Sequence, residues 1–403
     1  MNTNHITELL EFIYGETGAK KILSPLMELL GAFKKEHVPA AGTARGAITH
    51  KDALLISYGD MISAPAETSG EPVKPDGAAG ADGTALARLG RFLAAWNKST
   101  FSYLHLLPFH PYSSDDGFSV IDYRKVDPRL GDWDDIEELG KRFKMTFDFV
   151  INHGSVQSEW FKKFIAGEEK FRNWYITRPE NYDWSAVVRP RTHPLLTPFT
   201  KSDGSKTLVW TTFSADQVDY DFSQPEVLLE FIRIFLDYSR RGGRMLRLDA
   251  IAYLWKEDGT PCLHHPKTHA VVKLLRAIID YLGLEMLILT ETNVPHKENI
   301  SYFGGSGAGE SGSAGDTAGG AEAHMVYNFA LPPLVLHAAI SGDAGPLRAW
   351  AAALPALGEG NCFLNFLASH DGVGLTPAKG LIEDTAFAQT LEEAQKRGCF
   401  SWR

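Results

Sequence analysis

Seven predicted strands alternate with predicted helices along this chain of 403 residues. The strands are short apolar runs bounded by glycine, proline or polar residues, and the segments between them carry apolar residues at helical spacing. The strands are expected at residues 52–62, 103–108, 145–151, 244–250, 285–290, 325–330 and 363–369. This alternation indicates an α/β fold with a parallel sheet, and seven repeats favour a (β/α)8 TIM barrel over an open sheet, with seven of its eight repeats present.

Three stretches interrupt the repeats. Residues 167–215 are rich in arginine, proline and aromatic residues, and their length predicts a small, loop-rich, functional insertion domain after the third strand. Residues 64–84 read as a flexible loop, and the Gly/Ser-rich run at 304–321 is typical of a disordered insert. The barrel is therefore expected to occupy residues 1–166 and 216–403.

Composition excludes several classes of protein. A hydrophobic content of 44% with 22% charged residues is that of a globular chain, and a net charge of −10 argues against a nucleic-acid partner. No apolar run has membrane-spanning length, and the N-terminus lacks the pattern of a secretion signal. The three cysteines (Cys262, Cys362 and Cys399) have no metal-ligand spacing. We expect a cytoplasmic protein without a membrane partner.

Ionisable residues gather where the predicted strands end. In a barrel, the carboxyl ends of the strands carry the catalytic groups. The second to fifth strand ends and the seventh supply Asp115, Asp116, Asp148, Asn152, His153, Arg247, Asp249, Glu291, His370 and Asp371. Arg247 and Asp249 share one face of their strand and could form a structural ion pair. Five strand ends of this kind are hard to explain by stability alone.

Asp249 and Glu291 suit retaining chemistry at a glycosidic carbon. One carboxylate attacks the sugar, and the other protonates the leaving oxygen and then takes a proton from the acceptor. Arg247 should favour the ionised form of Asp249, whereas burial after an apolar run should raise the pKa of Glu291. Asp371 would be a third carboxylate. His153 and His370 could hydrogen-bond sugar hydroxyls, and an apolar wall could come from Phe118, Phe213 and Tyr253.

Four motifs in the chain resemble those of the α-amylase superfamily of glycoside hydrolases. They are Asp148 to His153 (DFVINH), Arg247-Leu248-Asp249, Glu291 in LTETN, and His370-Asp371 in FLASHDG, in the family's order. The resemblance implies that Asp249 is the nucleophile, Glu291 the acid/base and Asp371 the transition-state stabiliser.

Three further runs resemble the sucrose phosphorylase group of that superfamily: DDGFSVIDYRKVD, GDWDDIEELG and WTTFSADQVDYDF. By this resemblance Asp115 and Phe118 bind glucose, Phe213 closes the site, and Gln217 belongs to it. Runs such as EAHMVYNFALPPLVLHA resemble the branch that acts on glucosylglycerate. That branch implies reversible phosphorolysis to α-glucose 1-phosphate and glycerate, with inorganic phosphate as co-substrate, no organic cofactor and no metal.

Other readings stay open. The chain could be a sucrose or sucrose 6-phosphate phosphorylase, a hydrolase or transglucosylase, or a non-catalytic remnant. Candidates for binding an acidic acceptor are Arg189, Arg191, Lys256 and Lys267, each of which could instead be a surface charge. Because the family continues past residue 403, we expect a fragment or incomplete gene product, without the eighth repeat and C-terminal β domain, that is insoluble or inactive.

Overall fold

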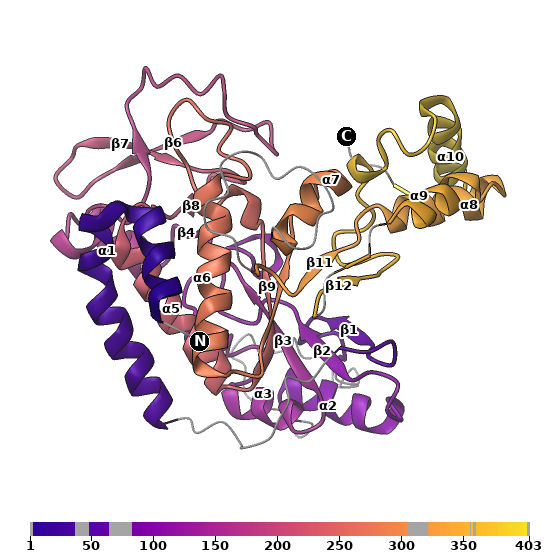
Figure 1. Ribbon diagram of the computed structural model, residues 1–403, viewed down its shortest axis with the longest axis horizontal. Helices are drawn as coiled ribbons and strands as arrows, with labels where there is room; N and C mark the ends of the chain where they lie inside the picture. The colour runs from indigo at the N-terminus through magenta and orange to yellow at the C-terminus, as the bar shows by residue number, and fades with distance from the viewer. Residues whose placement is uncertain are drawn as a thin grey trace, which may run out of the picture. The chain divides into compact units, whose positions relative to one another are not determined.

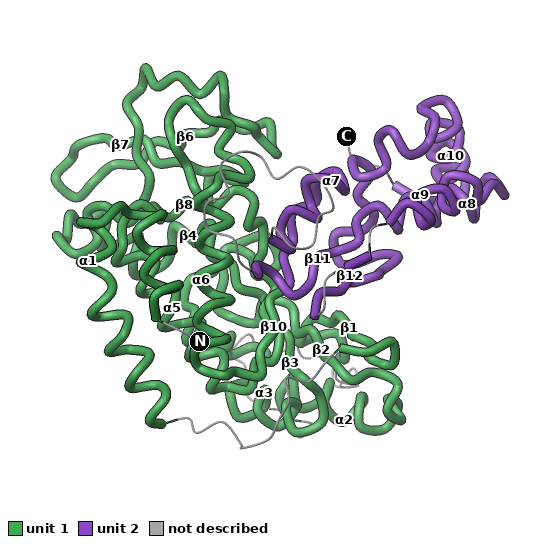
Figure 2. Tube along the Cα trace, viewed as in Figure 1, with its two compact units in different colours: residues 1–288 green, residues 289–403 purple. Residues whose placement is uncertain are grey.

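The computed structural model describes residues 3–36, 48–63, 83–304, 321–354, 356–357 and 360–400. It divides into two compact units, Met1–Ile288 and Leu289–Arg403 (Figure 2). Most of the expected loop at 64–84 and of the insert at 304–321 lies outside the described residues. No helix within the described ranges is long and apolar enough to cross a bilayer.

The first unit contains four neighbouring parallel strands in the order β1-β2-β3-β9 (Figure 1). They are β1 (Leu54–Ser57), β2 (Tyr103–Leu106), β3 (Lys144–Phe149) and β9 (Gly243–Leu248). The helices are α1 (Thr3–Glu36), α2 (Ala85–Trp96), α3 (Trp133–Gly140), α4 (Glu159–Ile165), α5 (Pro225–Arg240) and α6 (Pro266–Leu282). Residues of β2, β3 and β9 such as Leu104, Phe147 and Leu246 are fully buried. Parallel strands buried on both faces are what a helix-covered sheet requires.

Local signals explain where these helices begin. Asp132 caps α3 by accepting hydrogen bonds from the backbone amides of Asp134 and Asp135, and the Asp132 amide donates in turn to the Asp135 carboxylate. A proline in the first turn starts α5 and another starts α6, where the missing amide proton costs nothing. α1 packs against α5 and α6 (Figure 1), with Leu9, Leu26 and Leu30 buried.

The expected insertion contains more order than its sequence suggests. β5 (Thr177–Arg178), β6 (Leu196–Thr200) and β7 (Lys206–Trp210) form an antiparallel sheet, which the loop-rich prediction missed. A hydrophobic cluster joins Leu196 and Trp210 to Cys262, in the segment that follows β9. A second antiparallel pair, β4 (His153–Ser155) with β8 (Gln217–Asp219), flanks the insertion. The insertion is therefore fixed at both ends to the strands that carry candidate site residues.

In the second unit, parallel strands follow the order β10-β11-β12: β10 (Leu287–Thr290), β11 (Met325–Tyr327) and β12 (Cys362–Leu364). The chain enters this unit within β10. Its helices are α7 (His296–Asn299), α8 (Leu331–Ser341), α9 (Gly345–Ala353) and α10 (Asp384–Lys396). α8, α9 and α10 enclose a small core that includes Leu334, Trp350 and Ile382.

Candidate active site

A buried chain of charges crosses the carboxyl ends of β2, β3 and β9. His105 Nε2 lies 2.9 Å from Asp148 Oδ2. Arg247 Nη1 donates to Asp148 Oδ1 at 2.6 Å and to Asp249 Oδ1 at 2.7 Å. All four residues are at most 8% exposed. Buried ions of this kind require paired and hydrogen-bonded neighbours, which each member of this chain supplies to the next.

The carboxylates of Asp148 and Asp249 differ in the direction of their pKa shifts. Burial raises the pKa of Asp148, but the charges and hydrogen bonds of His105 and Arg247 outweigh it and lower that pKa to about 2. Burial also raises the pKa of Asp249; Arg247 and His153 oppose it without overcoming it. We expected Arg247 to keep Asp249 ionised, and the net direction is the opposite. The reason is that burial of the Asp249 carboxyl outweighs the attraction of Arg247, and the nearby Asp148 carboxylate adds repulsion.

A second cluster brings together side chains from four segments of the first unit. Gln217 Nε2 donates to Asp115 Oδ2 at 2.8 Å. The Phe213 ring packs 5.1 Å from the His153 ring, and the Arg247 guanidinium lies 5.5 Å from the centre of the Phe118 ring. In the first unit, the residues thus joined by contacts are Asp115, Phe118, His153, Phe213, Gln217, Arg247 and Asp249. Tyr253 extends this wall, with its ring edge-on to Phe213 at 5.4 Å.

The hydrogen bonds of His153 specify one tautomer. Its Nδ1 lies 3.2 Å from the Asn152 side-chain amide nitrogen, which can only donate. Nδ1 therefore accepts, and Nε2–H donates to the carbonyl of Phe118 at 3.1 Å. The 3.2 Å approach of Gln217 Nε2 to the same ring nitrogen is then a contact between two donors, because that ring nitrogen carries a proton and an amide nitrogen can only donate. His153 holds the backbone of Phe118 rather than offering a free acceptor.

Lys256 corrects one expectation. It is neither a surface charge nor accessible to an acceptor: its Nζ lies 2.5 Å from Asp219 Oδ2, and both side chains are at most 1% exposed. It also donates to Asn152 Oδ1 at 2.6 Å. Asp219 accepts further bonds from the backbone and hydroxyl of Thr212. This pair fixes Asn152 beneath His153. Asp219 was missed in the sequence because no local pattern around it indicates that its partner is Lys256, which is distant along the chain.

The other acceptor candidates lie in different surroundings. Arg189 is half-buried, and its Nη2 atom is buried without a hydrogen-bond partner among the described residues. Burial, Arg189 and Arg191 together lower the pKa of His193. Arg191 is exposed. Lys267 Nζ lies over the Trp255 ring at 4.7 Å. Arg189 is therefore the candidate whose polar atoms are least satisfied.

The remaining candidates belong to the second unit. Glu291 follows β10 directly and is half-buried. His370 and Asp371 lie in the loop after β12, where His370 Nε2 is 3.2 Å from Asp371 Oδ2. The Asp371 side chain is 68% exposed, and its amide donates to the Ser369 hydroxyl. Each of these residues thus follows a parallel strand at its carboxyl end, as expected.

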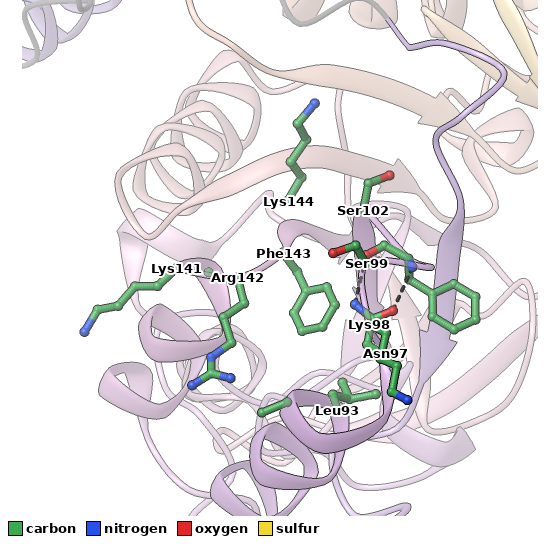
Figure 3. A pocket seen from close by; sticks show the side chains of 12 residues that line it. Leu93, Asn97, Lys98, Ser99, Ser102, Lys141, Arg142, Phe143 and Lys144 are labelled. Atoms are coloured by element: carbon green, nitrogen blue, oxygen red, sulfur yellow. Dashed lines mark hydrogen bonds between the residues drawn. The ribbon is translucent and has the colours of Figure 1, made fainter.

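A cavity of about 620 Å³ lies elsewhere in the first unit. It is lined by the ends of α2 and α3 and by the residues that lead into β2 and β3, so it opens at the amino ends of these strands. Lys141, Arg142 and Lys144 line it, but Figure 3 shows their side chains pointing in different directions. These cations do not converge on one point, and the candidate site residues lie at the opposite strand ends.

Comparisons with known proteins identify relatives of this chain. The family model described as alpha amylase, catalytic domain, matches residues 100–333. The glucosylglycerate phosphorylase of Spirochaeta thermophila is 45% identical over 98% of this chain and 62% of its own length. The sucrose phosphorylase of Agrobacterium vitis is 30% identical over 74% of this chain and 60% of its own.

A solved structure, sucrose 6F-phosphate phosphorylase from Thermoanaerobacter thermosaccharolyticum, superposes with a TM-score of 0.71 at 24% identity. The match covers 89% of this chain and 67% of that one. This likeness and the alternating parallel strands confirm the expected barrel class. The chain spans 62% to 66% of the length of the three glucosylglycerate phosphorylases that it matches.

Proposed function

Because the chain belongs to the α-amylase family, we propose that it is a retaining glucosyl phosphorylase that converts glucosylglycerate and phosphate to α-glucose 1-phosphate and glycerate. The observation that carries this choice is the 45% identity to a glucosylglycerate phosphorylase along 98% of the chain, against 30% along 74% for a sucrose phosphorylase. The substrate is small, and the protein acts without an organic cofactor or a metal.

In the first half-reaction, a carboxylate oxygen of Asp249 attacks the anomeric carbon of the glucosyl unit. The bond from that carbon to the glycerate oxygen breaks, and Glu291 gives its proton to the leaving oxygen. A covalent β-glucosyl-enzyme and free glycerate result. The Arg247 hydrogen bond to Asp249 Oδ1 supports this role, because it fixes the plane of the carboxylate and leaves its second oxygen for the sugar.

In the second half-reaction, phosphate replaces water as the acceptor. Glu291, now ionised, takes a proton from phosphate while a phosphate oxygen attacks the anomeric carbon and releases Asp249. Two inversions give net retention, so the product is α-glucose 1-phosphate. Asp371 stabilises the positive charge that develops on the sugar ring in both steps.

The glucosyl unit is assigned to the cluster around Asp115 and Phe118. The Asp115 carboxylate can accept hydrogen bonds from sugar hydroxyls, and Phe118 and Phe213 offer aromatic faces to the ring. Gln217 orients Asp115 through its 2.8 Å hydrogen bond. His370 is assigned a hydrogen bond to a sugar hydroxyl.

Arg189 is the group that we assign to the glycerate carboxylate. Its buried Nη2, without a protein partner among the described residues, could make a charge-assisted bond with a carboxylate. Arg189→Gln should raise the KM for glycerate about tenfold or more and leave the KM for α-glucose 1-phosphate nearly unchanged. Arg172→Gln, at an arginine whose side chain is 69% exposed, is the matched control.

The proposed reaction is tested by phosphate release from α-glucose 1-phosphate by the purified chain. Glycerate, fructose, fructose 6-phosphate and no acceptor are compared, with the Asp249→Ala variant as the blank. Release that requires glycerate supports the proposed function. Release that requires fructose or its phosphate would instead make the chain a sucrose or sucrose 6-phosphate phosphorylase, and equal release without acceptor would make it a hydrolase.

A further inference from the structure

One carboxylate next to the proposed glucose subsite is surrounded by serine hydroxyls. Asp216 Oδ2 accepts from Ser113 and Ser114 at 2.5 Å each and from Ser119 at 2.8 Å. Ser155 Oγ lies 2.5 Å from Ser113 Oγ and donates to it, since the Ser113 proton is already given to Asp216. We call these four hydroxyls and the Asp216 carboxylate the serine clamp. A carboxylate that accepts several hydroxyl protons forms strong, charge-assisted bonds.

The serine clamp flanks a turn whose backbone conformation is unfavourable. Asp115, Asp116 and Gly117 have φ angles of 58°, 48° and 109°. Two of these residues carry a Cβ atom, for which the left-handed region is costly. Gly117 is required, because a Cβ there would lie 2.8 Å from the Pro108 carbonyl oxygen. Such a turn persists only where its surroundings hold it.

Residues of the serine clamp lie on both sides of this turn in the sequence. Ser113 and Ser114 precede the turn and Ser119 follows it, and the amides of Ser113 and Ser119 donate to the carbonyls of Ser119 and Ser114. The next residue after Asp216 is Gln217, which donates to Asp115 within the turn. Two consecutive residues therefore bind the turn, one through its serines and one through its functional carboxylate.

We propose that Asp216 is a positioning residue that holds the 115–117 turn in the conformation in which Asp115 and Phe118 receive the glucosyl unit. The inference rests on the proposed function for the identity of that ligand. Asp216 acts through the serines and touches no substrate. Without it, three hydroxyls lose their shared acceptor, the turn relaxes toward negative φ, and Asp115 leaves the position that Gln217 fixes.

Hydrogen exchange tests the mechanical part without any need for turnover. In Asp216→Ala, the amides of Ser113, Ser119 and Ile121, which all donate within the loop, should exchange at least about tenfold faster, while β9 amides keep their rates. Asp203→Ala is the matched control, since Asp203 caps only its own exposed turn. Unchanged exchange at these three amides would overturn the clamp whatever the enzyme catalyses.

Glucose binding and kinetics test the positioning part. Asp216→Ala should lower kcat/KM for α-glucose 1-phosphate about 10- to 100-fold and weaken glucose binding by a similar factor, and the near-isosteric Asp216→Asn should lie between it and the parent. Ser114→Ala and Asp216→Ala should be non-additive in a double-mutant cycle. A variant with faster loop exchange but parental glucose affinity would contradict the positioning role. If the parent chain itself shows no phosphorolysis, the proposed function is refuted. The hydrogen-exchange result would still decide whether Asp216 holds the turn.

Discussion

Arg247 Nη1 lies 2.7 Å from Asp249 Oδ1 and shares the same nitrogen with Asp148 Oδ1 at 2.6 Å. One donor group thus connects the proposed nucleophile to a buried carboxylate on the neighbouring strand. Asp148 is held in turn by His105. The orientation of Asp249 therefore depends on residues from β2, β3 and β9, all of which belong to the first unit.

Asp249→Ala should reduce turnover at least about 10⁴-fold, because it removes the only route through a covalent intermediate that we propose. Phosphate release from α-glucose 1-phosphate measures this loss. Asp203→Ala, which removes a carboxylate from an exposed turn, should retain parental activity. Substantial turnover by the Asp249 variant would assign the nucleophile elsewhere.

Glu291→Gln should discriminate between donors. It should glucosylate Asp249 at a rate close to the parent only from α-glucosyl fluoride, whose leaving group needs no proton, and should lose activity with α-glucose 1-phosphate and glucosylglycerate. Initial rates with the three donors give the test. An equal loss with every donor would exclude Glu291 as the acid/base.

His110 should make the fold sensitive to mild acid. Its Nδ1–H donates to the Lys125 carbonyl, the Tyr238 hydroxyl donates to its Nε2, and burial lowers its pKa from 6.5 to about 4. Because the folded protein keeps His110 neutral while the unfolded chain takes up a proton, the stability that His110 contributes to the fold is full above pH 6.5, the unfolded-state pKa. This stability is lost as pH falls from 6.5 toward 4. His110 alone should cost about 2 kcal/mol between about pH 8 and about pH 5.

Urea denaturation at the two pH values measures this share. In His110→Gln the loss of stability on acidification should be smaller by that amount, whereas the exposed His50→Gln should behave as the parent does. The same acid sensitivity in parent and His110 variant would mean that other groups cause it.

The buried ion pair of Lys256 and Asp219 should be essential to the fold. Lys256→Met leaves the Asp219 carboxylate buried without its cation and should lower the unfolding free energy by about 3–5 kcal/mol. Adding Asp219→Asn should recover part of the loss, since the uncompensated charge is gone. The exposed pair of Lys162 with Glu159 offers the control, and Lys162→Met should change the denaturation midpoint little.

The helices and strand ends could be predicted from the sequence, because both follow from local patterns of residues. In the helix Pro225–Arg240, a first-turn proline and an amphipathic face mark the element in the sequence itself. Asp249, Asn152 and Glu291 were placed at strand ends, because strand periodicity and parallel pairing bring such ends to one edge.

The contacts that it did not reach join distant segments. Asp216 and Ser113 lie 103 residues apart, and no local sequence pattern around either residue predicts their contact. The strands β5 to β7 were missed because they are short and without clear alternation, and because β6 contains Pro198. The net direction of the Asp249 pKa depends on depth of burial and on Asp148, which only the fold reveals.

We propose above that Asp249 carries the glucosyl unit between glycerate and phosphate. The most direct measurement is the mass of the Glu291→Gln variant after reaction with α-glucosyl fluoride, followed by peptide mapping. We predict a gain of one glucosyl unit on the peptide that contains Asp249, and its discharge as a glucosyl adduct when azide, which needs no general base, is added. A glucosyl unit on another residue, or none with the donor fully consumed, would contradict the claim.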